Sequence, residues 1–420
     1  MRASRSGRSR SLTTSVLVAD YFRRDHARLI ATLVRRVGAR HLELVEDAVQ
    51  HAMVAALTTW QRGVPDDPTA WLHRVAHNKL VQDLRRAHGH ARILHGSEPT
   101  ELADEPPLAT FADEIGDDLL RMMFLCCDET IPWESQLVLA LKTLCGLSTD
   151  EIALRLFTSE ANVHKRLQRA RDRLRDGAPH IETPPLPALR SRLGGVHRVL
   201  YLLFNEGYLS AQEDHAIRRE LCEEAVRLTT QLAEHPVGAV PETFALLALM
   251  HLHTARLGAR VDAAGGLLVL EEQDRALWDR DRIQLGMRWL QRSAAGDVFS
   301  RFHAEAGIAA EHCLAPSFAE TRWREIAELY AHLETIAPSP LHSLNRAIAI
   351  AGLDGPAAGL AIVEAVVPPA WLEGSYLWDA ALADLHRRAG HDDLAERHRE
   401  RAVESAPTEA VRALLRRRLS

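Results

Sequence analysis

The stretch from Leu147 to Arg175, LSTDEIALRLFTSEANVHKRLQRARDRLR, predicts two helices joined by one short polar turn. Ser148 and Glu151 have the spacing of a capping box, in which a hydroxyl and a carboxylate bind backbone donors at a helix start. The break follows at Phe157, and Ser159 is a suitable N-cap for the second helix. This pattern is typical of a helix-turn-helix, although the turn of that motif often contains glycine where this chain has phenylalanine.

The second helix of this stretch has an apolar side and a basic side. At about 100° per residue, one narrow apolar seam is formed by Val163, Leu167, Ala170 and Leu174. The other side holds the candidate DNA contacts Asn162, Lys165, Arg166, Arg169 and Arg173. Such side chains reach phosphates and base edges together in a major groove. The pattern therefore favours DNA binding over a basic face that is only solvated.

The composition is that of an ordinary soluble protein, with 46% hydrophobic and 26% charged residues in a chain of 420. The net charge of -6 would oppose nucleic-acid binding if it were spread evenly, but Arg and His crowd residues 72–92 and the basic helix. Five cysteines form no disulfide or paired Cys-x-x-Cys pattern, which predicts buried thiols in a reducing cytoplasm. No apolar run reaches about 18 residues, so we expect no membrane segment.

Upstream, the pattern predicts a helix from about Leu42 to Trp60 that exposes Glu46, Asp47 and Gln50 and turns Leu57 inward. The loop Gln61 to Ala70, QRGVPDDPTA, separates it from a basic helix that starts near Trp71. His73 and His77 in that helix have a spacing that can bind a metal. No carboxylate or thiol shares their face, so contact with phosphates or bases is the favoured role.

The C-terminal half is rich in alanine and leucine and is broken by short Gly/Pro turns. Its clearest unit, YLWDAALADLHRRAGHDDLAERHRERAVESAP, matches the small and apolar positions of a tetratricopeptide repeat at Leu382, Ala383, Ala395, Ala402 and Pro407. Such repeats stack into a solenoid whose concave face binds a protein or peptide. A plain helical bundle is the alternative.

One group of residues in this half could be imagined as a metal or catalytic cluster: His251, His253, Asp262, Glu271 and Asp274. No nucleophile elbow, phosphate loop or HExxH motif accompanies them. We expect instead ion pairs made by Arg256, Arg260, Asp262 and Asp274. Gly265-Gly266 predicts a tight turn before a short strand.

The order and spacing of three motifs resemble regions two and four of a bacterial RNA polymerase sigma factor of the extracytoplasmic-function type. These motifs are VEDAVQHAMVAALTTW (45–60), WLHRVAHNKLVQDLRR (71–86) and LKTLCGLSTDEIALRLFTSEANVHKRLQRARDRL (141–174). The C-terminal half resembles the extension that one subgroup of these factors carries. The resemblance implies an all-α protein with two small helical domains, the second a helix-turn-helix, followed by a TPR-like domain.

The resemblance also implies roles for individual residues. Core polymerase would be bound by Glu46, Asp47 and Gln50. The minus-10 element would be bound by Trp71, Arg74, His77, Asn78, Lys79, Arg85 and Arg86. The minus-35 element would be bound by Asn162, Lys165, Arg166, Arg169 and Arg173.

The expected segments are a basic arm (1–15), region two (16–92), an acidic Pro-rich linker (93–116), region four (117–176), a second Pro-rich linker (177–188) and the helical extension (189–420). We expect a cytoplasmic sigma factor that is regulated by this extension, binds core RNA polymerase and promoter DNA, catalyses no reaction and takes no metal or cofactor. One alternative is a polymerase-independent helix-turn-helix regulator with a repeat-type sensor domain, which would not need region two. Another is a TPR-type scaffold, which would protect no promoter DNA.

Overall fold

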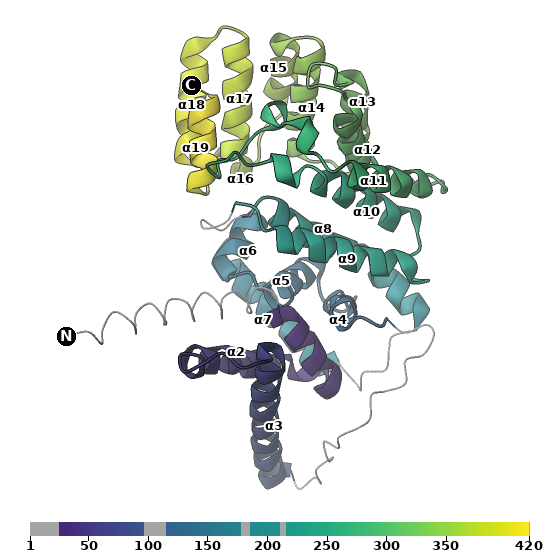
Figure 1. The fold of residues 1–420 in the computed structure, drawn as a ribbon, viewed down its shortest axis with the longest axis vertical. Helices are drawn as coiled ribbons and strands as arrows, with labels where there is room; N and C mark the ends of the chain where they lie inside the picture. Colours follow the sequence, from purple (N-terminus) through teal and green to yellow (C-terminus); the bar gives the residue numbers. More distant parts are fainter. Residues whose placement is uncertain (1–24, 96–114, 178–184, 211–215, 420) are drawn as a thin grey trace, which may run out of the picture. The chain divides into compact units, whose positions relative to one another are not determined.

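The computed structural model describes residues 25–95, 115–177, 185–210 and 216–419, and the chain divides into two compact units, Met1–Val199 and Leu200–Ser420. The described residues are mostly helical and contain no strand, which confirms the all-α prediction (Figure 1). The expected basic arm and most of both linkers lie outside the described residues.

The described part of the first unit has helical residues 25–37, followed by η1 (Ala39–His41), α2 (Leu42–Thr59) and α3 (Pro68–His95). The helix α3 packs on α2 because its apolar residues recur every four positions at Leu72, Ala76, Leu80 and Leu84, all at most 2% exposed. It starts at Pro68 and not near Trp71, since the Asp67 carboxylate accepts a 2.9 Å hydrogen bond from the Ala70 amide.

The second half of this unit comprises α4 (Asp118–Cys126), α5 (Trp133–Thr143), α6 (Thr149–Arg155) and α7 (Glu160–Gly177). The predicted capping box is present, with the Ser148 amide 2.7 Å from Glu151 Oε2. The predicted seam of α7 is buried, with Val163 and Ala170 at 0% exposure. Phe157 in the turn has φ 49°, the left-handed conformation that glycine supplies in other turns of this kind.

The helix α8 (Leu186–Tyr208) starts inside the segment expected as a linker and runs across the boundary between the units. Its first half packs on α4, where Arg192 donates a 3.3 Å hydrogen bond to the Phe124 carbonyl and pairs with Asp128. A Cβ atom at Gly195 would lie 3.0 Å from Cys127, so glycine permits this close approach. The first unit therefore includes the beginning of α8.

The second unit consists of helices in antiparallel pairs and a long connection between α10 and α11. Its main helices are α9 (Arg219–Glu234), α10 (Pro241–Thr254), α11 (Arg280–Ser293), α12 (Arg301–Leu314), α13 (Trp323–Ile336), α14 (Pro340–Leu353), α15 (Pro356–Glu364), α16 (Ala370–Glu373), α17 (Tyr376–Arg388), α18 (Asp392–Glu404) and α19 (Glu409–Arg418). In the expected repeat, α17 and α18 form a hairpin that turns at Gly390, with φ 77°. Ala383 and Ala402 lie buried in it.

The connection between α10 and α11 contains the short helices η2 (Leu257–Ala259), η3 (Leu270–Glu272) and η4 (Arg275–Leu277). The predicted tight turn is present, since Asp262 Oδ1 accepts hydrogen bonds from the Ala264 and Gly266 amides and Gly265 has φ 86°. The predicted strand is wrong, because the turn closes only one isolated antiparallel bridge, between Val261 and Leu267. Individual backbone hydrogen bonds, such as that from the Leu268 amide to the Arg260 carbonyl at 2.8 Å, hold this connection in place of a sheet.

All five cysteines are buried and free, as the sequence predicts. Burial raises the pKa of the Cys127 thiol to about 12, with Arg192 and Arg198 acting in the opposite direction. The thiol therefore stays protonated and packs as a small apolar group. Across the described ranges, no helix is both long enough and apolar enough to cross a membrane.

Candidate functional site

The basic face of α7 is open to solvent within the first unit. Asn162, Lys165, Arg169 and Arg173 are exposed, and Arg166 is half-buried. Lys165, Arg169 and Arg173 border one surface hollow, so the structure brings three of the predicted minus-35 residues together. Asn162 lies at the start of the helix, where its amide group is 3.4 Å from Thr158 Oγ1 and its backbone donates to Ser159. The N-cap that the sequence predicts thus presents Asn162 at the exposed end.

The opposite side of α7 faces α2. Arg171 forms an ion pair with Glu46, and Arg175 Nη1 lies 3.5 Å from Glu43 Oε2. At about 100° per residue, Arg171 lies about 160° around the helix from Arg169, and Arg175 lies about 120° from it. The contact between α2 and α7 therefore leaves the basic face uncovered.

The three predicted polymerase contacts lie in two environments. Asp47 and Gln50 are exposed on α2. The side chain of Glu46 is only 16% exposed, because its carboxylate accepts a 2.8 Å hydrogen bond from Thr143 and pairs with Arg171. The structure thus presents two of the three residues to solvent.

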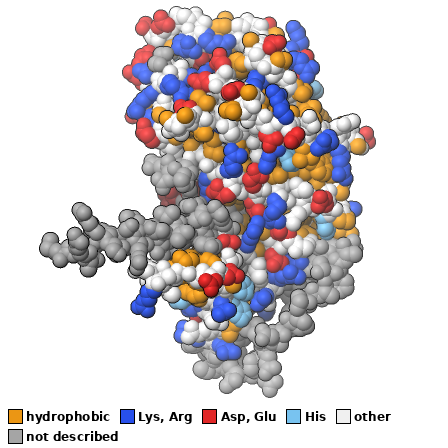
Figure 2. All heavy atoms as spheres, in the orientation of Figure 1, with side chains coloured by type: hydrophobic (Ala, Val, Ile, Leu, Met, Phe, Trp, Pro, Cys, Tyr) orange, Lys and Arg blue, Asp and Glu red, His pale blue; other side chains and the backbone are white. Residues whose placement is uncertain are grey.

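An exposed stripe on α2 includes two apolar residues that the sequence analysis did not select. Val54 is 56% exposed and Leu57 is 37% exposed, so the prediction that Leu57 packs inward is wrong. Together with Asp47 and Gln50 they follow a spacing of three and four residues, which places all four on one helical face. Figure 2 shows hydrophobic and acidic side chains adjacent to each other over α2. The spacing from Asp47 could have identified this stripe.

The basic helix α3 presents a second cationic surface. Arg74, Asn78, Arg85 and Arg86 are exposed, whereas Trp71, His77 and Lys79 are half-buried. Figure 2 shows Lys, Arg and His side chains gathered over this helix. Arg74, Asn78 and Arg85 are separated by four and seven residues, so they share one face of α3, and Arg86 lies about 100° further around the helix than Arg85.

Two of the half-buried residues on α3 have partners within the unit. The Trp71 ring packs edge-on against buried Trp60, with 5.6 Å between ring centroids, and so stands at the rim of the core. Lys79 Nζ is 2.8 Å from both carboxylate oxygens of Asp83. The charge of Lys79 is therefore largely compensated in this structure.

The rings of His73 and His77 stack with their centroids 6.3 Å apart. Burial, then Arg36 and His77, lower the pKa of His73, so its ring is held neutral. No third histidine, cysteine or carboxylate joins them, and in the described ranges no group of three or more such residues could hold a metal.

The residues imagined as a cluster in the second unit are not brought together. His251 and His253 are enclosed in α10, Asp262 stabilises its own turn, and Asp274 accepts a hydrogen bond from the Ala276 amide. Asp262 lies 3.9 Å from Arg417 Nη1. Among the described residues Arg256 and Arg260 pair with no carboxylate, so the predicted ion pairs are wrong for these two arginines. Arg260 instead lies with its guanidinium carbon 3.7 Å from the centroid of the Tyr208 ring, and Arg256 Nη2 is 3.4 Å from the Tyr208 hydroxyl.

Comparison with known proteins gives three family matches. Residues 22–89 match "Sigma-70 region 2", residues 121–174 match "Sigma-70, region 4", and residues 192–294 match a "Family of unknown function (DUF6596)". The first two matches include α2, most of α3, and α5 to α7, which carry the surfaces described above. The third begins within α8 and ends after α11.

Two relatives are similar to this chain. An uncharacterized protein of Rhizobium meliloti is 35% identical over 384 residues, which is 90% of both chains. The ECF RNA polymerase sigma factor SigE of Mycolicibacterium smegmatis is 28% identical over 161 residues, 37% of this chain and 60% of that protein. No solved structure matches the chain.

Proposed function

We propose, on the premise that this chain belongs to the ECF-type sigma factors that have a C-terminal extension, that it binds core RNA polymerase and directs it to promoters under control of that extension. The observation that carries the proposal is the coexistence, in one unit, of two exposed basic helices and an exposed acidic and apolar stripe. A sigma factor needs three such surfaces, because it grips promoter DNA at two points and polymerase at a third.

The stripe on α2 is the proposed polymerase contact. Solvent-exposed Val54 and Leu57 offer apolar area, and Asp47 adds a charge that can select a basic partner surface. Glu46 would contact polymerase only after its ion pair with Arg171 breaks, since this pair now holds the Glu46 carboxylate inside the unit. We therefore assign initial binding to Asp47, Gln50, Val54 and Leu57.

The helix α3 is the proposed minus-10 contact. Opening a promoter unstacks bases, which costs a few kcal/mol per step and is offset by stacking and phosphate contacts. Trp71 stands half-exposed beside Arg74 and His77, so an aromatic face and cationic groups occur together. Arg85 and Arg86 extend the cationic surface along the strand.

The helix α7 is the proposed minus-35 reader. Lys165, Arg169 and Arg173 are exposed cations that neutralise phosphates, and Asn162 is placed at the helix start where base edges are reached. Arg166, which is half-buried, lies beside them. The proposed function is a binding role and not an enzymatic one, exercised in the bacterial cytoplasm where polymerase and promoter meet.

The extension is proposed to control the first unit and to bind a protein or peptide partner through its helical hairpins. The continuous helix α8 supports this role, because it packs on α4 within the first unit and then enters the second. The polymerase-independent regulator is disfavoured by the region-two match, since such a protein would not need this domain.

The test uses purified full-length chain and core polymerase. We expect the two to co-elute and to give run-off transcripts from a cognate promoter, identified by sequencing transcript starts made on fragmented genomic DNA. Asp47→Lys should reduce co-elution by at least about tenfold, because it reverses a contact charge. Glu400→Lys, an equal charge change at an exposed position on α18, is the matched control. A chain that fails to bind core polymerase under these conditions is not a functional sigma factor.

A further inference from the structure

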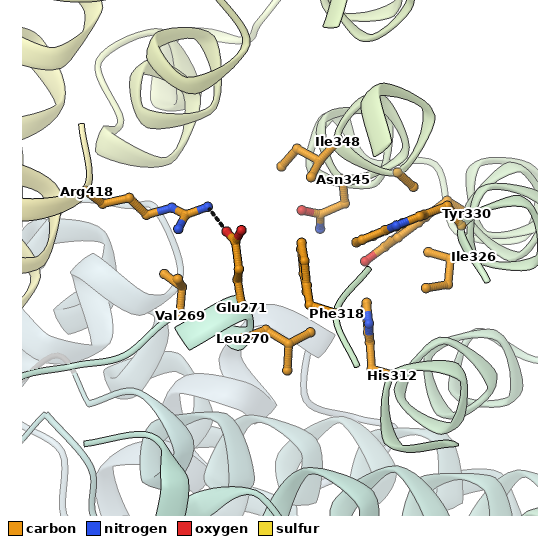
Figure 3. A pocket seen from close by; sticks show the side chains of 12 residues that line it. Val269, Leu270, Glu271, His312, Phe318, Ile326, Tyr330, Asn345, Ile348 and Arg418 are labelled. Carbon is orange, nitrogen blue, oxygen red and sulfur yellow. Dashed lines mark hydrogen bonds and ion pairs between the residues drawn. The ribbon is translucent and has the colours of Figure 1, made fainter. Parts of the chain in front are cut away.

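The second unit contains a pocket of about 260 Å³ that the proposed function does not use. It is lined by side chains from η3, α12, α13, α14 and α19, together with the segment before α13 (Figure 3). An apolar cavity of about 150 Å³ can hold benzene. The pocket is therefore large enough for a molecule with one or two rings.

One wall of the pocket is aromatic. The rings of Phe318 and Trp323 meet edge-on with centroids 5.2 Å apart, and His312 meets Trp323 at 5.8 Å. Burial, then Arg256 and Arg275, lower the pKa of His312 to about 3, so the imidazole is neutral. Its Nδ1 atom is buried and has no hydrogen-bond partner among the residues that the structure describes. This wall thus suits a flat apolar ring with hydrogen-bonding capacity at its edge.

The other end of the pocket has one cation and one anion. Arg418 Nη2 lies 3.1 Å from Glu271 Oε2, and Figure 3 shows the two side chains pointing toward each other, with the Asn345 amide facing the same space. Glu271 and Arg418 are both partly exposed, at 52% and 31% of their side-chain areas. Because an exposed pair of this kind is weak, a competing anion can replace Glu271.

Two further cations lie behind His312. Arg275 donates 2.8 Å hydrogen bonds to the carbonyls of His312 and Ala315, and Arg256 donates to Tyr208. Within the described part of the chain, neither guanidinium pairs with a carboxylate. Arg256 and Arg275 therefore add positive potential on the side of His312, whereas the two charged lining residues, Glu271 and Arg418, balance each other.

We propose that this pocket binds a small planar aromatic carboxylate. The ring would pack on Phe318 and Trp323, and the carboxylate would replace Glu271 at the Arg418 guanidinium, which offers a planar pair of donors. The proposal concerns the second unit alone and goes beyond the sigma-factor role, so either can fail without the other.

The test is isothermal titration calorimetry on the full-length chain with two probes that share one ring system. Indole-3-acetate carries a carboxylate and tryptamine carries an ammonium group. We expect indole-3-acetate to bind with a Kd of about 1 mM or tighter, and about tenfold or more tightly than tryptamine. Equal binding of the two probes, tighter binding of tryptamine, or no binding of indole-3-acetate would overturn the proposal.

Three variants test whether indole-3-acetate binds in this pocket. Arg418→Gln should weaken indole-3-acetate binding by about tenfold or more, whereas Glu271→Gln should strengthen it by about three- to tenfold, because the competing carboxylate is gone. Ile348→Trp, at a position 38% exposed, should fill the pocket and abolish binding. If the ion pair between Glu271 and Arg418 only stabilised the fold, Arg418→Gln and Glu271→Gln would change the affinity for indole-3-acetate in the same direction. That result would refute the assignment. Thermal melting of each variant checks its fold. If the other variants fail to fold, Glu271→Gln still tests the proposal, because this side chain is exposed.

Discussion

Glu46 on α2 and Arg171 on α7 form an ion pair although they are 125 positions apart in the chain. Thr143 on α5 donates a 2.8 Å hydrogen bond to the same carboxylate. A second link joins the same halves, since Arg35 lies 3.1 Å from Asp118 at the start of α4. One ion pair thus joins the residues that match region two and region four, and the other joins region two to Asp118, just before the region-four match. If Glu46 contacts polymerase, its ion pair with Arg171 has to break first.

The first prediction concerns this closed arrangement. Arg171→Gln and Glu46→Gln should each lower the free energy of unfolding by about 1 to 3 kcal/mol, with a coupling energy of similar size, since the pair is largely buried. Arg171→Gln should also tighten binding to core polymerase, because Glu46 no longer has to leave a partner. Urea titration and binding measurements on the two single variants and the double variant check both effects. Additive stability changes would mean that the pair is not coupled.

The second prediction separates the two sides of α7. Arg169→Ala should weaken holoenzyme binding to a minus-35 element and reduce the salt dependence by about one phosphate contact. Arg175→Ala, about 120° around the same helix and paired with Glu43, is the matched control and should change DNA binding little. Fluorescence anisotropy over a range of salt concentrations makes the comparison. Equal losses in both variants would remove the basic face from the DNA site.

The third prediction concerns Phe157, whose φ of 49° is unfavourable for a side chain with a Cβ atom. Phe157→Gly should leave stability unchanged or raise it by up to about 1 kcal/mol, because glycine adopts this conformation without strain. Phe157→Val should lower it by about 1 to 2 kcal/mol, since branching at Cβ is least compatible with positive φ. Thermal melting of both variants decides whether the phenylalanine is only tolerated or makes a needed contact.

Local signals predicted the helix-turn-helix well. The capping box at Ser148, the seam at Val163 and the break at Phe157 all depend on residues a few positions apart, so periodicity and capping rules reveal them. The buried small residues of the α17 and α18 hairpin follow from the same kind of pattern.

The sequence did not predict contacts between residues that are far apart in the chain. Nothing in the local pattern around Glu46 indicates Arg171, because the pairing depends on how two helical domains meet. The sequence predicts ion pairs for Arg256 and Arg260, yet both contact Tyr208. Cation–π contact competes well with an ion pair where burial removes water.

The fourth prediction concerns pH. Burial, then Arg282, lower the pKa of His251 to about 4, against about 6.5 in an unfolded chain. The unfolded state therefore binds more protons, and His251 contributes stability above pH 6.5 that is lost as pH falls toward 4. The loss should be about 1.4 kcal/mol per pH unit well within that window. His251→Asn should show a correspondingly smaller loss between pH 6 and pH 5 in urea titrations, and identical slopes would contradict the assignment.

The last prediction concerns the start of α8. Removal of the chain after Asp176 takes away the part of α8 that packs on α4, so we expect the truncated protein to lose transcription activity. Gly195→Leu tests the same contact in the full-length chain, because a Cβ there would already lie 3.0 Å from Cys127. Gly194→Leu is the matched control, since the nearest atom to its Cβ is Arg198 Nη2 at 4.0 Å.

We expect Gly195→Leu to lower run-off transcription and Gly194→Leu to preserve it, with both proteins still binding core polymerase. The difference would assign control to the seating of α8 on α4, because both variants retain the whole extension and add the same side chain to the same helix. If truncation abolishes activity while Gly195→Leu leaves it intact, control depends on other contacts of the extension. If truncation also leaves activity intact, the extension is dispensable for initiation.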